Sequence, residues 1–297
     1  MKISIITATK NNKSGLLRAI ESVRIQTYKN VEHIIVDGGS TDGTVEAINN
    51  EQLTMLNDQC SMYNVQFISE LDNGIYDAIN KGIKLASGDV IGLLHSDDFY
   101  TDEYVLEKVL QAFQDIGLEE KDKSFFGVEA VYSDLVYVRS KAKDEKRKKS
   151  VSESNEYFAL STEHSVIRKW KTQNEEFTTE TQRHREILKG WMPPHPTLFL
   201  RRTVFENYGL YRTDMKIAAD YEMILRLFFK SEVTSFYLPV TTYCMTIGGV
   251  SNKSLKNILR KSSEDYYAMK LHGIPFPLKT LLLKNFRKLP QFFNKSK

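Results

Sequence analysis

Cysteine is scarce in this 297-residue sequence: there are two, Cys60 and Cys244, far apart in the chain. A zinc site or a disulfide framework needs cysteines at close, regular spacings, and these two match no such pattern. We therefore expect two unpaired thiols in a protein of a reducing compartment.

Long hydrophobic runs are absent as well. No stretch of about 20 apolar residues occurs, so the sequence predicts no membrane-spanning helix. The apolar segment after Met1 is too short for a secretory signal peptide and fits a first β-strand better. We therefore expect a cytoplasmic protein.

The sequence also lacks a strong charge imbalance, with a formal net charge of only +3. Bulk electrostatics of this size do not favour a nucleic-acid partner, and we expect none. A composition with 41% hydrophobic and 27% charged residues is typical of an ordinary globular protein rather than a disordered one.

Acidic residues are missing from one region, because no Asp or Glu follows Asp265. Lysines and arginines alternate there with leucines and phenylalanines at helical spacing, behind Pro275 and Pro277. The basic residues are Lys270, Lys279, Lys284, Arg287, Lys288, Lys295 and Lys297, and the apolar ones are Leu278, Leu281, Leu282, Phe286, Leu289 and Phe293. A basic amphipathic helix suits an anionic membrane surface. A helix docked on the rest of the protein is the alternative.

Two common nucleotide-binding motifs are absent. No Gly-x-Gly-x-x-Gly follows the first strand, and no Gly-x-x-x-x-Gly-Lys-Ser/Thr occurs anywhere. The sequence therefore supports neither a dinucleotide-binding fold nor a P-loop. A nucleotide would have to be held in another way.

What the sequence does contain, over its first hundred residues, is a regular alternation of strands and helices. Short apolar segments at 3–7, 32–36, 66–68 and 90–94 are separated by amphipathic helical stretches. This pattern predicts βαβ units in an α/β fold: a Rossmann-like, mostly parallel sheet with helices on both faces. Ligands of such sheets bind beyond the carboxyl ends of the strands.

Each of these four strands ends in a polar cluster, at 7–11, 37–42, Asp72-Asn73 and Asp97-Asp98. One such cluster would be a turn, but four at one edge of a sheet indicate a binding site. Asp37 and Asp72 can accept hydrogen bonds from a base or a ribose. The adjacent Asp97 and Asp98 can reach a diphosphate only through a hard divalent cation. The alternative is that one of this pair caps a helix that begins near residue 101.

The four clusters lie in segments with a family resemblance. Ile-Ile-Thr-Ala-Thr-Lys-Asn, Val-Asp-Gly-Gly-Ser-Thr-Asp-Gly-Thr, Asp-Asn-Gly-Ile-Tyr-Asp-Ala-Ile-Asn-Lys-Gly and Ser-Asp-Asp occur in this order. Together they resemble the family 2 glycosyltransferases, inverting enzymes of the GT-A fold, over residues 1–100 strongly and 190–250 well. The resemblance implies a GT-A domain at 1–250, with a donor half at 1–98 and an acceptor half at 99–250. A helical, basic amphipathic tail would follow at 251–297.

The resemblance also implies the donor site. Its residues fall on Thr7, Ala8, Asn11, Asp37 and Asp72. Lys81 is a further candidate for contact with the diphosphate, and the alternative is a solvated helix lysine. The metal motif falls on Asp97, which would hold Mn²⁺ or Mg²⁺ with Asp98 assisting through hydrogen bonds. Many members of the family carry another acid where this chain has His95.

Three residues of the acceptor half are candidates by the same resemblance. Asp220 matches the second acid of the family's Glu-Asp pair, whose first acid is replaced by Ala219, and would be the catalytic base. The alternative is a first-turn residue favoured by the helix dipole. His195, between two prolines, would lie beside the active site; a structural histidine is the alternative. Asp134 would lie near the donor sugar, unless it is an exposed strand carboxylate. Residues 150–189 receive no role.

The resemblance thus predicts a metal-dependent inverting transferase of the hexosyltransferase class. It would move a sugar from a nucleotide sugar, with UDP favoured, to a hydroxyl of a lipid-linked saccharide at the inner face of a bacterial cell membrane, for surface polysaccharide. A sugar nucleotidyltransferase and a non-catalytic sugar-nucleotide binding module are the alternatives.

Overall fold

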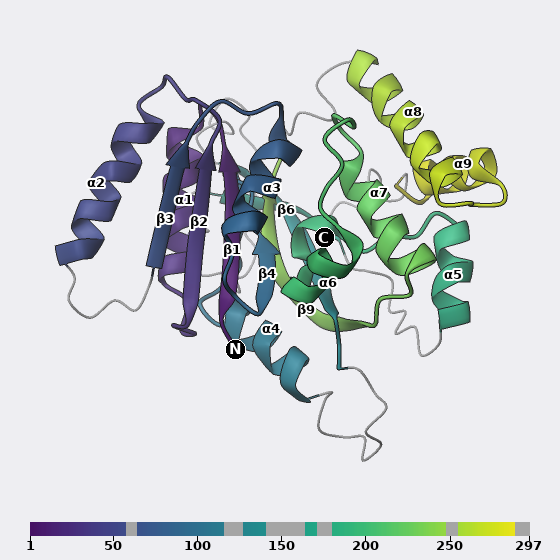
Figure 1. Ribbon diagram of the computed structural model, residues 1–297, viewed down its shortest axis with the longest axis horizontal. Helices are drawn as coiled ribbons and strands as arrows, with labels where there is room; N and C mark the ends of the chain where they lie inside the picture. Colours follow the sequence, from purple (N-terminus) through teal and green to yellow (C-terminus); the bar gives the residue numbers. More distant parts are fainter. Residues whose placement is uncertain (58–63, 116–126, 141–163, 171–179, 248–254, 289–297) are drawn as a thin grey trace.

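The computed structural model describes residues 1–57, 64–115, 127–140, 164–170, 180–247 and 255–288. Over these residues the chain forms a nine-stranded sheet with helices on both faces (Figure 1). The strand order is β3-β2-β1-β4-β8-β6-β9-β5, and β7 pairs with β6 outside this path.

The N-terminal half of the sheet is wholly parallel. Its strands are β1 (Ile3–Thr9), β2 (Val31–Asp37), β3 (Asn64–Ser69) and β4 (Val90–Leu93), joined by α1 (Lys13–Arg24), α2 (Thr44–Asn57) and α3 (Ile75–Leu85). Thr9 lies opposite Asp37, and Asp37 lies opposite Ser69. The polar strand ends therefore meet at one edge, as the sequence predicts.

The second half of the sheet mixes both strand directions. It contains β5 (Phe99–Tyr100), β6 (Ala130–Ser140), β7 (His164–Trp170), β8 (Phe199–Arg201) and β9 (Ser235–Thr246). The strands β6 and β9 are parallel, whereas β5, β7 and β8 pair in the antiparallel direction. Antiparallel pairing thus enters the mostly parallel sheet through β5, β7 and β8.

The register of β8 explains how residues far apart in sequence meet. Because β8 runs antiparallel to β4, with Phe199 opposite Gly92, the chain just before β8 lies beside the chain just after β4. The segment before β8 is a 3₁₀ turn, His195–Thr197. His195 is thereby brought toward the carboxyl end of β4, where Asp97 follows.

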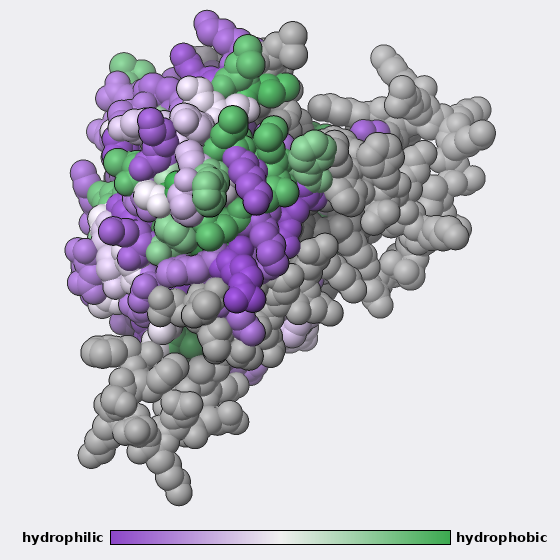
Figure 2. All heavy atoms as spheres, turned by 90° about the vertical axis from the view of Figure 1, so that its right-hand side faces the viewer, coloured by the Kyte–Doolittle hydropathy of each residue, from purple (hydrophilic) through white to green (hydrophobic). Residues whose placement is uncertain are grey.

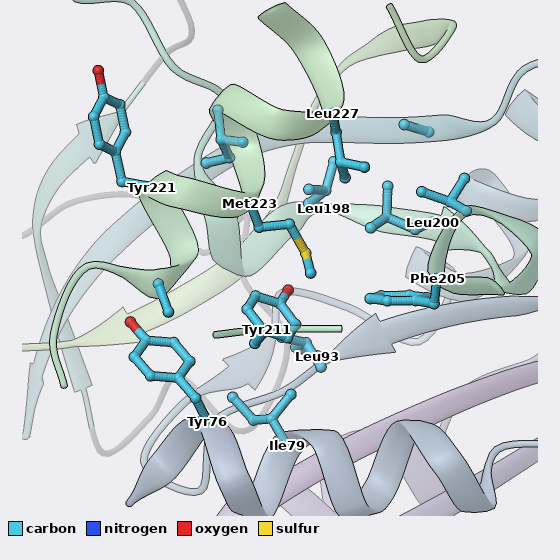
Figure 3. Close-up of a cluster of buried hydrophobic side chains, with 14 of the residues drawn as sticks. Tyr76, Ile79, Leu93, Leu198, Leu200, Phe205, Tyr211, Tyr221, Met223 and Leu227 are labelled. Carbon is cyan, nitrogen blue, oxygen red and sulfur yellow. The ribbon is translucent and has the colours of Figure 1, made fainter. Parts of the chain in front are cut away.

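Helices of the second half complete both layers. They are α4 (Val105–Asp115), α5 (Glu180–Leu188), α6 (Arg202–Tyr208) and α7 (Ala219–Leu225), which continues as a π-helix (Arg226–Lys230). One apolar cluster joins α1 and α4 to one face of the sheet, and a larger one joins α3, α6 and α7 to the other. Figure 3 shows Met223 and Leu227 pointing toward Leu198 and Leu200 beside β8. Full burial of each such side chain stabilises the fold by about 1.5–3 kcal/mol, so α7 is firmly held on the sheet.

The C-terminal helices α8 (Leu255–Leu271) and α9 (Pro277–Lys288) lie beside α7 and α5 (Figure 1, yellow). One face of α9 is docked on the protein: Lys284 pairs with Asp265 at 2.8 Å, and Arg287 pairs with Glu186 at 2.8 Å. The backbone of α9 also approaches Gly190 so closely that a Cβ there would lie 2.3 Å from the Lys284 nitrogen. Docking on the protein is thus what the structure shows for this face. In the described part of the chain, no helix has the length and apolarity needed to cross a membrane.

One expectation about secondary structure is corrected. The helix after Asp98 begins at Val105 rather than near residue 101, because residues 99–100 pair with β9 as a short strand. The stretch 150–189, for which the sequence predicted no role, includes β7 and α5. Outside the described residues lie 141–163, Cys60 and the basic C-terminal residues Lys295 and Lys297. Cys244 is a buried free thiol.

Candidate active site

The loops after β1 and β2 are joined by hydrogen bonds between their polar residues. The Asn11 backbone N–H donates to Ser40 Oγ at 2.7 Å, and the Thr41 N–H donates to Asn11 Oδ1 at 2.8 Å. Asn11 itself adopts a positive φ of 51°, which asparagine tolerates better than most residues. The two loops therefore form one polar rim at the sheet edge.

Asp37 holds the loop after β2 through hydrogen bonds to its carboxylate. Its side chain is fully buried, and Oδ2 accepts hydrogen bonds from the backbone N–H groups of Gly39 and Ser40 and from the Ser69 hydroxyl. The Ser40 hydroxyl donates to the other oxygen, Oδ1. Its predicted contact with a base stays a prediction, and the structure adds that Asp37 shapes the loop.

Asp72 lies against the same loop. Its Oδ2 approaches Gly38 so closely that a Cβ at that position would lie 2.0 Å away, so a larger residue there would displace the Asp72 carboxylate. Asp72 Oδ1 accepts the Gly74 N–H at 3.0 Å. The structure thus brings together the two acids predicted to bind the donor, although they are 35 positions apart in sequence.

Lys81 lies at the rim of this region. Its ammonium group is 2.9 Å from the Glu70 carboxylate and donates to the Leu71 carbonyl oxygen at 3.0 Å. It therefore braces the loop that carries Asp72. A contact with the diphosphate stays a prediction.

Thr7 and Ala8 are buried inside β1. The Thr7 hydroxyl lies 2.8 Å from His33 Nε2, whose pKa burial lowers to about 3, so this imidazole is neutral. The Thr7 side chain is therefore committed to β2, and its backbone is the part that can face a ligand.

The turn after β4 separates Asp97 from Asp98. Asp98 is buried, and its carboxylate accepts the Tyr243 hydroxyl at 3.1 Å and the Thr246 backbone N–H at 2.8 Å. Burial and the negative charge of Asp97 raise the pKa of Asp98 well above its usual value. These contacts with β9 exclude the helix-capping alternative for Asp98.

Asp97 has the opposite environment. Its side chain is partly exposed, and no hydrogen bond to its carboxylate occurs among the described residues. Its backbone carbonyl is held instead, by Thr246 Oγ1 at 2.5 Å and by the Arg18 guanidinium at 3.2 Å. A fixed backbone with open carboxylate oxygens fits a hard divalent cation. In the described part of the chain no three His, Cys, Asp or Glu side chains cluster for metal binding, so a cation there would need oxygens from a ligand.

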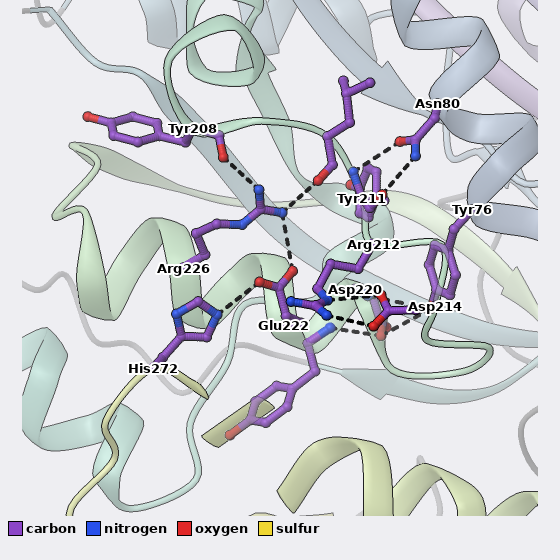
Figure 4. Close-up of polar contacts among 12 residues, drawn as sticks. Tyr76, Asn80, Tyr208, Tyr211, Arg212, Asp214, Asp220, Glu222, Arg226 and His272 are labelled. Atoms are coloured by element: carbon purple, nitrogen blue, oxygen red, sulfur yellow. Dashed lines mark hydrogen bonds and ion pairs between the residues drawn. The ribbon is translucent and has the colours of Figure 1, made fainter. Parts of the chain in front are cut away.

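Asp220 begins the helix α7 and is partly exposed. Its Oδ1 lies 3.3 Å from the Tyr76 hydroxyl and accepts the Tyr221 N–H at 2.8 Å (Figure 4). The hydrogen bonds to this carboxylate within the described residues all reach Oδ1, which leaves Oδ2 to take a proton. Burial alone would raise the pKa of Asp220, but the Lys284 ammonium and the hydrogen bond from the Tyr221 backbone N–H are among the causes that hold this pKa below its usual value. Asp220 is therefore ionised at neutral pH.

Two histidines connect Asp220 to the turn after β4. The negative charges of Asp97 and Asp220 favour the protonated form of His95, and that of Asp220 favours the protonated form of His195. Burial nevertheless lowers the pKa of each, to about 4 for His195, so both imidazoles are neutral at pH 7. The structure thus gathers Asp97, His95, His195 and Asp220 into one site.

Tyrosines hold this group in place. His195 Nε2 lies 2.9 Å from the Tyr211 hydroxyl, and the Tyr211 ring stacks on Tyr76 with centroids 5.8 Å apart. Asn80 exchanges two backbone-directed hydrogen bonds with Tyr211, at 2.7 and 3.0 Å (Figure 4). The helix α3 therefore positions both the predicted base and His195.

Asp134 lies on β6 and is only 5% exposed, which corrects the exposed-strand alternative. Its Oδ1 accepts the Tyr237 hydroxyl at 2.9 Å. Tyr237 stacks in turn near Tyr132, which contacts Trp191. Asp134 is thus held in an aromatic environment, and proximity to a donor sugar stays a prediction.

Several residues of the site were missed by sequence reasoning. Tyr76 and Asn80 are four positions apart on α3, a spacing that places both on one helix face and could have indicated a shared role. Tyr211 lies in a loop and Tyr243 lies inside β9, and neither carries a local signal of a functional role.

Comparison with known proteins identifies related sequences. Residues 4–119 match the family model described as glycosyl transferase family 2. An uncharacterized glycosyltransferase of Mycobacterium tuberculosis is 29% identical over 245 residues, 82% of this chain and 72% of the relative. A PGL/p-HBAD biosynthesis glycosyltransferase of Mycobacterium bovis is 27% identical over 250 residues, 84% of this chain and 78% of the relative.

Solved structures show the same architecture. The crystal structure of residues 1–349 of S. aureus TarS matches 98% of this chain and 72% of its own, with a TM-score of 0.57 and 16% identity. The mannosyltransferase PcManGT from Pyrobaculum calidifontis, in complex with GDP-Man and Mn²⁺, matches 98% of this chain and 71% of its own, with a TM-score of 0.59 and 16% identity. These matches confirm the GT-A fold expected from the sequence.

Proposed function

Because the chain belongs to the family 2 glycosyltransferases, we propose that it transfers a hexose from a nucleoside diphosphate sugar to an acceptor hydroxyl with inversion. The observation that carries this proposal is the placement of His95. The charges of Asp97 and Asp220 both act on its imidazole, which supports placing an open carboxylate that fits a cation and an ionised carboxylate that fits a general base in the same region of the molecule. Transfer needs these two functions close together.

The donor is assigned to the rim formed by the loops after β1, β2 and β3. There Asp37 and Asp72 offer acceptors to a base and a ribose, and Asn11 joins the first two loops. TarS has been solved with UDP and with UDP-GlcNAc, and PcManGT with GDP-Man. We favour a UDP-sugar for this chain.

Asp220 is the proposed base. A hydroxyl is a poor nucleophile until a carboxylate takes its proton, and Asp220 Oδ2 is the oxygen left for this purpose. Tyr76 and Tyr211 keep their protons, because burial and the charge of Asp220 raise their pKa values. They can therefore orient Asp220 and His195 without titrating. Attack from the side opposite the leaving group inverts the anomeric carbon through an oxocarbenium-like state.

Asp97 is the proposed ligand of Mn²⁺ or Mg²⁺, together with the oxygens of the donor's diphosphate. The cation would neutralise negative charge that develops on the leaving nucleoside diphosphate. Asp98, Tyr243, Thr246 and Arg18 hold the turn in place for Asp97.

A lipid-linked saccharide at an anionic membrane surface is the proposed acceptor, which would place the chain in surface polysaccharide synthesis. Nine of the fourteen exposed large hydrophobic side chains among the described residues lie in 255–288, including Leu259, Phe276, Leu278, Leu282 and Phe286. Figure 2 shows this side of the molecule, where apolar side chains gather among hydrophilic ones. The absence of acids beyond Asp265 leaves this apolar face with basic neighbours such as Lys270 and Lys279. Such a face favours binding to anionic lipid.

A thermal-shift screen of UDP-, GDP- and dTDP-sugars with Mn²⁺ tests the donor assignment, because a ligand that binds the native state raises Tm. We expect the largest shift with one UDP-sugar, and a smaller one without the cation. NMR of the product of transfer to a saccharide acceptor should then show an inverted anomeric configuration. A Tm that no nucleotide sugar changes, or a retained configuration, would contradict the proposal.

A further inference from the structure

The helix α7, which carries Asp220, has no capping side chain at its N-cap position. The first backbone N–H groups of a helix have no partner inside the helix and need an acceptor from elsewhere. Ala218 occupies the N-cap position, and its methyl group cannot accept a hydrogen bond. Serine, threonine, aspartate or asparagine would ordinarily be found there.

Glu264, on the C-terminal helix α8, supplies an acceptor for the N-cap residue Ala218 and for the two residues before it. Its Oε2 accepts the backbone N–H groups of Ile217 at 2.8 Å and Ala218 at 2.9 Å, and its Oε1 accepts the N–H of Lys216 at 3.1 Å. One carboxylate from 46 to 48 positions further along the chain thus satisfies three consecutive N–H groups.

Ile217, whose N–H Glu264 accepts, also binds Tyr76, the tyrosine that contacts Asp220. The Tyr76 hydroxyl lies 2.8 Å from the Ile217 carbonyl oxygen and 3.3 Å from Asp220 Oδ1. Glu264 fixes the Ile217 peptide through its N–H, and Tyr76 binds the carbonyl oxygen of that same residue. A shift of this turn would therefore move Tyr76 and Asp220 relative to each other.

The residue after the base is held from the same side. The Lys284 ammonium lies 3.1 Å from the centroid of the Tyr221 ring and pairs with Asp265, the neighbour of Glu264 on α8. Glu222 accepts hydrogen bonds from His272 at 2.9 Å and Arg226 at 3.2 Å (Figure 4). The C-terminal helices thus hold α7 on both sides of Asp220.

From these contacts we propose that Glu264 is a positioning residue of the transfer reaction, which sets the orientation of Asp220 by capping α7 from outside. This inference rests on the proposed role of Asp220 as the base. It makes the C-terminal helical pair part of the catalytic apparatus, although the pair contributes no group that touches a substrate.

Three variants test the proposal: Glu264→Ala, Glu264→Gln and the control Glu206→Ala. Glu206 is an exposed carboxylate on α6 whose one ion pair within the described residues is with Arg202 on its own helix. The probe is release of nucleoside diphosphate, with water as acceptor, from the nucleotide sugar that raises Tm most in the screen with Mn²⁺. Because a misplacement of about 1 Å can cost roughly 100-fold, we expect Glu264→Ala to lower kcat about 10- to 100-fold and leave the donor KM within about twofold. Glu264→Gln, which keeps an acceptor oxygen, should recover much of kcat, and Glu206→Ala should match the wild type.

A double variant separates positioning from a general loss of structure. Adding Glu264→Ala to Asp220→Asn should change the residual rate little, because the group being positioned is already absent. Equal fold losses in both backgrounds would overturn the proposal. A wild-type kcat for Glu264→Ala, with Asp220→Asn inactive, would overturn this inference alone. An active Asp220→Asn would overturn the proposed function and this inference with it.

Hydrogen exchange provides a readout that needs no activity. In folded Glu264→Ala, the amides of residues 216–218 lose their acceptor and should exchange faster, while those of β1 and β2 keep wild-type rates. Unchanged exchange at residues 216–218 would show that Glu264 does not hold this turn, and would also overturn the proposal.

Discussion

The donor rim and the predicted base are held in different ways. Asp37 is held largely by its own loop, through Gly39 and Ser40, and by Ser69 on the adjacent strand. Asp220 depends on residues from far apart in the chain: Tyr76 lies 144 positions before it, and Glu264 caps its helix from α8. The rim is thus held mainly by nearby residues, whereas Asp220 is positioned by contacts from α3 and the C-terminal helices.

This difference predicts that damage to each region will have a different signature. Changes in the rim should weaken donor binding and leave the chemical step largely intact. Changes around Asp220 should slow the chemical step and leave donor binding intact.

The largest expected effect is that of Asp220→Asn. An amide cannot take the acceptor proton, and general base catalysis contributes about 100- to 10,000-fold, so kcat should fall by roughly 1,000-fold or more. Donor affinity, measured by calorimetry, should stay within about twofold of the wild type. Near-wild-type turnover would remove Asp220 from its assigned role.

Removal of the divalent cation should have the next largest effect. Unlike changes in one region alone, it should lower both donor affinity and the rate of transfer. EDTA should stop transfer, and Mn²⁺ or Mg²⁺ should restore it, because the cation serves both diphosphate binding and the leaving group. Donor affinity should fall in parallel. Full activity in the presence of chelator would contradict the assignment of Asp97.

Asp37→Ala tests the rim. It removes the acceptor shared by four donor groups, so we expect donor Kd to rise about 10-fold and the free energy of unfolding to fall by about 1–3 kcal/mol. The kcat at saturating donor should change little. Glu46→Ala, at an exposed position of the following helix α2, is the control. A large fall in kcat for Asp37→Ala would contradict the distinction between the two regions.

The double variant Lys284→Met with Asp265→Asn removes both members of a buried ion pair. We expect it to shift the pH profile of kcat and to change kcat at neutral pH little. Lys284 holds the pKa of Asp220 below its usual value, so its loss should raise that pKa and move the acid limb of the kcat profile to higher pH. The stability that ionised Asp220 contributes, present above its unfolded-state pKa, should likewise disappear at a higher pH as the solution is acidified. An unmoved acid limb would show that the lysine does not act on Asp220.

The smallest effect on catalysis should come from the exposed face of α9. Leu278→Ser, Leu282→Ser and Phe286→Ser together should abolish co-sedimentation with phosphatidylglycerol vesicles, while donor hydrolysis in solution stays unchanged. Leu85→Ser, at an exposed position of α3, is the control. Deletion of residues 275–297 should also release the protein from vesicles, but it removes the buried Lys284 too, so the triple variant is the cleaner test. Unchanged co-sedimentation would count against membrane binding.

The same contrast explains how far the sequence could predict the molecule. Local patterns predict β1 to β4 and the polar residues Asp37, Asp72 and Asp97 that follow three of the strands. An apolar run followed by short polar residues can be recognised in a stretch of about ten residues. The sequence also predicted a helix over the α9 region, since its apolar residues recur with helical period.

The remainder depends on contacts that no local pattern reveals. Strand β8 has only three residues, and its antiparallel register, which brings His195 to the end of β4, is set by tertiary pairing. Glu264 resembles any other charged helix residue in sequence, and Lys284 resembles an exposed basic residue of an amphipathic helix but is buried. Their contacts depend on the packing of α8 and α9 beside α7, which no local pattern predicts.

The cap supplied by Glu264 has a consequence for the synthesis of the protein. Residues 216–218 are made before residue 264, and their N–H groups gain this acceptor only after α8 has emerged and docked. The turn that leads into Asp220 is therefore among the last parts of the proposed site to be fixed.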